Sequence, residues 1–282
     1  MRKIIIPTDF SESAMTAIRY AMELFKYEKS EMIIMNAFAD DVYENTMEMD
    51  REFFEEYKQK TKEATERALQ KIVAEMLAIS FNPKHTYNYV ASFGSLVDEV
   101  NDLVDKHNAD VVVMGTKGKS NREQVTFGSQ TLQVIKYVKC PVLAVPVGYK
   151  GYPLKNILFP TDYMLPVGRR ELKLVSTLAA RFVSRIQFLH ISDVSNLSHR
   201  QMDNKIFLSK CFEDNQVSHK KSAGNDITQI INKTIKEAST DMLVMVNHRH
   251  SYLENIFYQS TIEKIGLEIN IPFLVLQNLQ RN

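Results

Sequence analysis

The sequence predicts an α/β fold made of two tandem domains, each with a five-stranded, parallel, doubly wound sheet. Short apolar runs alternate with longer stretches whose apolar residues recur every three or four positions. Two sequence motifs occur twice, in the same order. The length of 282 residues exceeds one average domain and suits two. With 44% hydrophobic residues, the chain has the composition of a globular protein with a substantial core.

The repeat divides the chain into two copies. Residues 3–9 (KIIIPTD) recur 153 residues later as residues 156–162 (NILFPTD). Residues 110–114 (DVVVM) recur 131 residues later as residues 241–245 (DMLVM). The second copy therefore lacks 22 residues between the motifs, the difference of the two offsets, and the charged stretch around residues 40–60 is the expected loss. The turn-rich sequence GYKGYP then links a first domain, residues 1–148, to a second, residues 153–282.

Five stretches of the first copy are typical of buried strands. Apolar runs predict these strands at residues 4–7, 32–37, 85–90, 111–114 and 142–145. Because parallel strands need crossover connections, the stretches between them are expected to be helical. In such sheets, ligands bind beyond the carboxyl ends of the strands, where the strand order reverses.

The helices are predicted from their starts and their apolar faces. Ser11 or Ser13 can cap a helix after the first strand. The apolar face of that helix is formed by Ala14, Ile18, Ala21 and Phe25. Further helices are predicted at residues 51–77, 96–105 and 130–138. The longest of them is expected to bury Tyr57, Ala64, Ala68, Ile72 and Met76.

The loop after the fourth strand has the composition of a phosphate-binding loop. Gly115 and Gly118 are followed, after nine residues, by Gly128 and Ser129. Glycines let backbone N–H groups approach phosphate oxygens without a Cβ in between. Gly128 and Ser129 begin the next helix, whose first N–H groups suit an anion, and Ser129 adds a hydroxyl. Lys117 and Lys119 add positive charge. The spacing differs from the Walker loop and from the dinucleotide fingerprint.

This loop, together with Pro7, Thr8 and Asp9, resembles that of the universal stress protein family, and the resemblance covers both copies. It implies Rossmann-like domains of the adenine nucleotide alpha hydrolase-like type, with ATP, with or without Mg²⁺, bound in the first domain. Asp9 would contact the ribose or adenine, and Ala37 would lie against the adenine. The ribose and phosphates would be surrounded by Met114, Gly115, Lys117, Gly118, Gly128, Ser129 and Gln130.

The second copy departs from this pattern. At the register of the three glycines it has Val246, Arg249 and Gln259, and Ser260 alone keeps its residue type. Three side chains then project where the backbone must approach phosphate, and a β-branched valine disfavours left-handed backbone angles. The second domain is therefore predicted to be structural or to offer a different binding surface.

Two other groups of residues have more than one interpretation. Asp9 and Asp162 can be ligand contacts or helix N-caps. His248 and His250 suit a solvated loop better than a metal site, since no cysteine or carboxylate cluster accompanies them. No metal-binding and no catalytic residues are predicted.

Composition limits the environment and the partners. A net charge of +1 and a pI of about 7.7 argue against a broad nucleic-acid or membrane surface. The apolar run at the start stops at Pro7, too early for a signal peptide, and no apolar stretch reaches the ~18 residues of a membrane span. Two cysteines cannot form a disulfide framework. A cytoplasmic protein is expected.

Three functions are compatible with these features. The first is an ATP-binding stress-response sensor or regulator that acts through conformation and partners. The second is a slow ATPase or nucleotide hydrolase, although the loop offers only Glu123 as a base and no metal-binding acid. The third is a nucleotide-free interaction module. The last strands of the two copies can pair within one chain and form an intramolecular pseudo-dimer. A homodimer of whole chains is left open.

Overall fold

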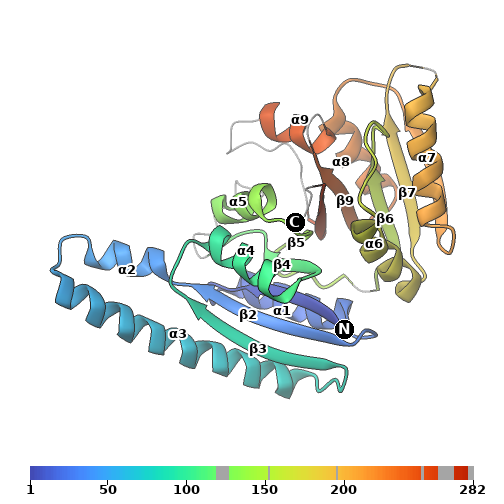
Figure 1. Cartoon of the computed structure of the whole chain (residues 1–282). Coiled ribbons are helices and arrows are strands. Elements are labelled where there is room, and N and C mark those ends of the chain that lie inside the picture. The colour runs from blue at the N-terminus through green and yellow to red at the C-terminus, as the bar shows by residue number, and fades with distance from the viewer. Residues whose placement is uncertain (119–126, 152, 195, 249–250, 260–269, 279–282) are drawn as a thin grey trace.

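The computed structural model describes the 282-residue chain except residues 119–126, 152, 195, 249–250, 260–269 and 279–282. Ten strands form one continuous sheet in the order β3-β2-β1-β4-β5-β10-β9-β6-β7-β8 (Figure 1). Neighbouring strands are parallel except β5 and β10, which are antiparallel. The predicted α/β class, with five parallel strands in each half, is confirmed.

In its described residues, the first half contains five strands and five helices. They are β1 (Arg2–Pro7), α1 (Glu12–Leu24), β2 (Ser30–Ala37), α2 (Ala39–Thr46), α3 (Arg51–Ile79), β3 (His85–Ser92), α4 (Leu96–His107), β4 (Val111–Gly115), α5 (Ser129–Tyr137) and β5 (Val142–Val145). The second half repeats this order with one helix fewer among the described residues. Its elements are β6 (Asn156–Pro160), α6 (Arg169–Phe182), β7 (Arg185–Ile191), α7 (His199–Cys211), β8 (Gln216–Ser222), α8 (Ile227–Glu237), β9 (Met242–Asn247), α9 (Tyr252–Gln259) and β10 (Phe273–Gln277).

The two faces of the sheet have separate apolar cores. One core contains buried residues of α1, α3, α6 and α7, and the other contains buried residues of α4, α5, α8 and α9. Ser11 is the N-cap of α1 and accepts a hydrogen bond from the Ala14 N–H. The predicted apolar face of α1 is buried, as expected for an amphipathic helix on a sheet.

The segment between β2 and β3 differs from the prediction in two ways. Residues 39–46 form α2, because Asp40 and Asp41 lie in its first turn, where the helix dipole favours acids. In α3, the predicted buried face is correct only for Ile72 and Met76, whereas Ala64 is exposed. The N-terminal part of α3 runs past the end of the sheet beside α2, so no strand covers it (Figure 1).

The same unusual backbone conformations occur in both halves. Phe10 and Tyr163 follow the two Pro-Thr-Asp motifs, and both have positive φ angles, of 65° and 57°. Asn108 and Ser239 precede β4 and β9 with φ angles of 49° and 46°. Positive φ is uncommon outside glycine, so its recurrence at matched positions supports the internal repeat independently of residue identity.

The missing residues of the second half lie where the sequence predicts. The β2–β3 connection contains α2 with 8 residues and α3 with 29, whereas the β7–β8 connection contains α7 with 13. Where the structure describes it, the second half therefore has no counterpart of the part of α2 and α3 that projects beyond the sheet.

The halves meet at β5 and β10, whose pairing matches Leu143 with Leu274. The connection between the halves is anchored to both of them. The Tyr149 ring packs on Tyr20 with a centroid distance of 5.7 Å, and the Tyr149 hydroxyl donates to the Asp241 carbonyl at 3.2 Å. The predicted pairing of the two last strands is thus present, and it covers two strand edges at once.

Candidate nucleotide-binding site

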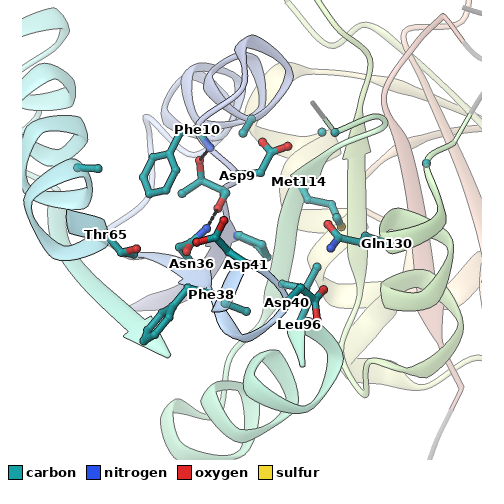
Figure 2. A pocket seen from close by; sticks show the side chains of 18 of the residues that line it. Asp9, Phe10, Asn36, Phe38, Asp40, Asp41, Thr65, Leu96, Met114 and Gln130 are labelled. Atoms are coloured by element: carbon teal, nitrogen blue, oxygen red, sulfur yellow. Dashed lines mark hydrogen bonds between the residues drawn. The ribbon is translucent and has the colours of Figure 1, made fainter. Parts of the chain in front are cut away.

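A cavity of about 1010 Å³ lies at the carboxyl ends of β1, β2 and β4. Strand order reverses between β1 and β4, so this is the position expected for a ligand in a doubly wound sheet. All the predicted site residues line this cavity: Pro7, Thr8, Asp9, Ala37, Met114, Gly115, Lys117, Gly118, Gly128, Ser129 and Gln130. Figure 2 shows Met114 and Gln130 on one side of it and Phe10 and Thr65 on the other.

The turn after β1 is held by its own short polar side chains. The Thr8 Oγ1 accepts from the Phe10 N–H at 3.0 Å, and the Asp9 Oδ1 accepts from the Ser11 N–H at 3.1 Å. Asn36 at the end of β2 donates its Nδ2 to the Thr8 carbonyl at 2.7 Å. Asp9 is therefore a turn-forming residue that also lines the cavity, and it is not the helix N-cap. Asp162 makes the equivalent bond, with the Met164 N–H.

The three glycines of the loop have different surroundings. A Cβ at Gly115 would lie 2.3 Å from the Ser13 Oγ of α1, so this glycine is required for packing. A Cβ at Gly118 would lie 3.1 Å from the Asp9 Oδ2. A Cβ at Gly128 would meet backbone atoms only at 3.7 Å or more, which is ordinary contact. The fold thus tolerates a side chain at Gly128 far better than at Gly115.

The N-terminus of α5 faces the cavity. Gly128 is its N-cap, and its N–H donates to the Thr116 carbonyl at 2.8 Å. The Thr131 Oγ1 donates to the Gly115 carbonyl at 3.0 Å and fixes the helix to the end of β4. The first N–H groups of a helix have no intrahelical acceptor, so those of Ser129 and Gln130 are suited to an anion.

Charged side chains of both signs line the cavity. Lys117 and the α5 N-terminus lie on the β4 side with Asp9, whereas Asp40, Asp41 and Glu44 lie on α2 and Lys60 lies on α3. Carboxylates repel phosphate, and a helix N-terminus attracts it. An anionic group is therefore favoured beside the α5 N-terminus, where Lys117 also lies.

One wall of the cavity was not predicted. The side of α3 that faces it contributes Tyr57, Lys60, Thr61, Ala64, Thr65 and Ala68. These residues recur at helical spacing and are mostly small or polar, which is a sequence signal for a face that lines a cavity. Asn36 was missed as well, because a polar residue at a strand end has no local pattern.

Several residues discussed above lie outside the described part of the chain. They are Lys119, Glu123, Arg249, His250 and Ser260. Among the described residues, no group of three or more His, Cys, Asp or Glu side chains could hold a metal ion. Nor does any helix in the described ranges have the length and apolarity needed to cross a membrane.

Val246 does not need left-handed backbone angles, contrary to the prediction. Neither Val246 nor its counterpart Gly115 has a positive φ. Val246 is instead a buried residue of β9. What separates the two positions is space, since Gly115 is in close contact with α1.

The profile of the universal stress protein family matches residues 1–146, more than half of the chain. The chain belongs to the universal stress protein family. The universal stress protein MJ0531 of Methanocaldococcus jannaschii is 31% identical to it over 151 residues, which cover 51% of this chain and 81% of that protein. MJ0577 of the same organism is 29% identical over 157 residues, covering 51% and 94%.

Solved universal stress proteins share the fold over the whole chain. The crystal structure of one from Archaeoglobus fulgidus DSM 4304 matches with a TM-score of 0.67 at 17% identity and covers 98% of this chain and 96% of that one. A putative universal stress protein of Pseudomonas aeruginosa UCBPP-PA14 matches with a TM-score of 0.57 at 11% identity, covering 98% and 93%. The universal stress protein fold therefore extends into the second half.

Proposed function

We propose that this universal stress protein is a cytoplasmic sensor or regulator that binds ATP in its first domain. The observation that carries the proposal is the cavity at the strand-order reversal, where a glycine loop and a helix N-terminus meet. The proposed domains are residues 1–148 and 153–282, arranged as an intramolecular pseudo-dimer about β5 and β10.

The charges of the cavity suggest one orientation for the nucleotide. The phosphates would lie against Ser129, Gln130 and Lys117, and the adenine would lie against Ala37, near the carboxylates of α2. Bound Mg²⁺ would neutralise phosphate charge, and Asp9 would contact the ribose or adenine.

The proposal predicts one nucleotide per chain. Gly118 and Gly128 leave room for phosphate, and the second half has Arg249 and Gln259 at these positions. Isothermal titration calorimetry with ATP should give a stoichiometry close to one. A value near two would contradict binding by the first domain only, and no heat with either ATP or ADP would favour the nucleotide-free interaction module.

The loop is tested by a valine at Gly128. A Cβ at Gly128 makes only ordinary contacts, and the valine methyl groups would occupy the space beside the α5 N-terminus. Gly128→Val should therefore abolish ATP binding and leave the melting temperature nearly unchanged. Gly94→Val is the matched control, because a Cβ at Gly94 meets only the flexible Glu99 side chain and Gly94 does not line the cavity. Unchanged ATP binding by Gly128→Val would exclude the loop as the phosphate site.

Hydrolysis is expected to be slow. Groups that hold the triphosphate equally well in its ground and transition states do not accelerate its cleavage. Turnover should lie far below the ~10 s⁻¹ of typical enzymes. A steady-state ATPase assay measures it, with Asp9→Asn and Glu123→Gln as controls. Fast turnover that disappears in either variant would make the protein a nucleotide hydrolase.

A further inference from the structure

Tyr252 makes an unusual pair of hydrogen bonds in the second half. Its hydroxyl donates to the Ile191 carbonyl at 2.7 Å and accepts from the Ile191 N–H at 3.0 Å. Tyr252 begins α9 and is buried, and Ile191 is the last residue of β7. One side-chain oxygen thus satisfies both backbone groups of a strand end.

Ile191 is the counterpart of Ala37 in the nucleotide cavity. β2 and β7 pair with β1 and β6 at matched positions, so Ala37 and Ile191 are both the last residues of equivalent strands. The preceding residues also correspond: Asn36 bonds the Thr8 carbonyl, and His190 Nδ1 lies 3.0 Å from the Thr161 carbonyl.

The backbone of Ala37 is directed into the cavity. The Met35 carbonyl accepts from the Thr8 N–H on β1, and the Phe38 N–H donates to the Ser92 carbonyl on the β3 side. Successive residues of a strand direct their backbone groups to opposite sides, so the N–H and C=O of Ala37 point toward the β1 side. There β1 has ended and the cavity begins.

The other neighbours of Tyr252 are also counterparts of cavity residues. Burial raises the pKa of Tyr252 to about 12, and the nearby Asp162 carboxylate adds to this rise. Burial also raises the pKa of Tyr163, and Tyr252 contributes. Asp162 and Tyr163 correspond to Asp9 and Phe10, which line the cavity of the first half.

We infer that the second half retains a purine-edge subsite at Ile191 and that Tyr252 occupies it. An adenine edge offers one N–H donor and one ring-nitrogen acceptor, which complement a backbone C=O and N–H. A phenol hydroxyl both donates and accepts, so its single oxygen takes the place of the N–H donor and the ring-nitrogen acceptor of adenine. This inference rests on the proposed function, because it takes Ala37 as the adenine contact of the first half.

The corresponding position of the first half is not a tyrosine. At an offset of 131 residues, Tyr252 corresponds to Asn121, which has no aromatic ring and lies outside the described residues. The Tyr252 closure thus adds a second reason, besides the lost glycines, to expect nucleotide in the first half only. The ligand class expected at an opened Ile191 subsite is an adenine nucleoside, since the phosphate loop is altered there.

The test uses adenosine as the probe and backbone amide signals in NMR as the readout. In the unaltered protein, adenosine should shift the Ala37 amide and leave the Ile191 amide unchanged. In Tyr252→Ala, adenosine should shift both. Tyr137→Ala, which removes an exposed ring from α5, is the matched control and should behave like the unaltered protein.

A second variant makes the test independent of the stability of Tyr252→Ala. Tyr252→Phe keeps the ring and removes the acceptor of the Ile191 N–H, so adenosine should leave Ile191 unmoved and its amide should exchange with solvent about tenfold faster. Three results would each overturn the inference. The first is that adenosine shifts the Ile191 amide signal in the unaltered protein, and the second is that it fails to shift this signal in folded Tyr252→Ala. The third is that the Ile191 amide of Tyr252→Phe exchanges with solvent as slowly as in the unaltered protein. An unmoved Ala37 would count against the proposed function instead.

Discussion

Gly115 and Gly128 belong to one loop, but the structure assigns them different physical roles. The space beside Gly115 is filled by Ser13, including its backbone carbonyl at 3.0 Å from a hypothetical Cβ. At Gly128, the nearest atoms lie at ordinary contact distance. At the scale of single residues, a glycine in a phosphate-loop pattern can therefore serve packing instead of ligand approach.

Substitution of Gly115 should reveal this packing role. In Gly115→Ala, the new methyl group must displace α1 or Ser13, which is overpacking in a well-packed region and should cost about 1–3 kcal/mol of unfolding free energy. Urea denaturation measures the change, and Gly94→Ala should cost much less. If Gly115→Ala is as stable as the unaltered protein, α1 or Ser13 moves aside at no measurable cost in unfolding free energy.

Tyr252 should make stability sensitive to alkaline pH. Its pKa rises from 10.0 in the unfolded chain to about 12 in the fold, so the fold favours the protonated phenol. This stabilisation is complete below pH 10 and is lost as the pH rises toward 12. The unaltered protein should lose up to about 3 kcal/mol more than Tyr252→Phe over this range. Unfolding curves at both pH values measure the difference, and equal losses would contradict the buried phenol.

At the scale of elements, α2 and the start of α3 form a lobe held by aromatic rings. Phe93, after β3, lies 5.6 Å from the rings of Phe38 and Tyr43 and 6.1 Å from that of Phe54, measured between centroids. The Lys58 Nζ lies 4.4 Å above the same Phe93 ring. The lobe projects beyond the strands of the sheet (Figure 1).

Removal of the Phe93 ring should loosen this lobe selectively. Each aromatic pair contributes about 0.5–1.5 kcal/mol, so Phe93→Ala should speed hydrogen exchange in α2 and the first turns of α3 by tenfold or more while β1 and β4 stay protected. Hydrogen-exchange mass spectrometry makes the measurement. Phe53→Ala is the control, since this half-exposed ring stacks on Tyr57. Equal effects of the two variants would mean that Phe93 is not the centre of the lobe.

At the scale of the whole molecule, the second half supports the helix that faces the cavity. The rings of Phe127, just before Gly128, and Phe273 in β10 lie 5.6 Å apart. The buried Gln277 side chain donates from Nε2 to the Ile135 carbonyl of α5 at 2.8 Å. Arg170 of α6 donates to the Asn108 carbonyl at 3.0 Å. A half without an intact glycine loop thus still contributes to the geometry of the site.

Shortening Phe273 should therefore weaken nucleotide binding from a distance. Phe273→Leu and Phe188→Leu both remove a fully buried ring from the second half and should each cost about 1–3 kcal/mol of stability. Only Phe273→Leu should lower the affinity for ATP, by several-fold and at unchanged stoichiometry. Calorimetry on both variants measures this, and equal affinities would mean that α5 holds its position without β10.

The continuous sheet also predicts a compact particle in solution. A single domain-like body of 282 residues should have a radius of gyration of about 19 Å. Small-angle X-ray scattering measures this value. A clearly larger radius with two resolved bodies would show that the halves separate at β5 and β10.

The sequence by itself determined the local structure and the repeat of this universal stress protein. Buried parallel strands are apolar throughout, as in β4, and α1 shows helical periodicity, so both could be predicted from single segments. The glycine spacing and the Pro-Thr-Asp motif also identified those residues of the first cavity that lie at the ends of β1 and β4 and at the start of α5. These signals are local because they come from backbone geometry and from burial on one side of an element.

The tertiary structure alone decided the features that depend on distant segments. The helical spacing of Ala64 and Ala68 places them on one face of α3, but only the tertiary structure shows that this face lines the cavity. That Tyr252 bonds Ile191 depends on two elements 61 residues apart in the chain. The type of a residue gives the chemistry of its side chain, but the packing of the whole sheet decides which groups that side chain contacts. Contacts between distant segments therefore leave no pattern in a single sequence.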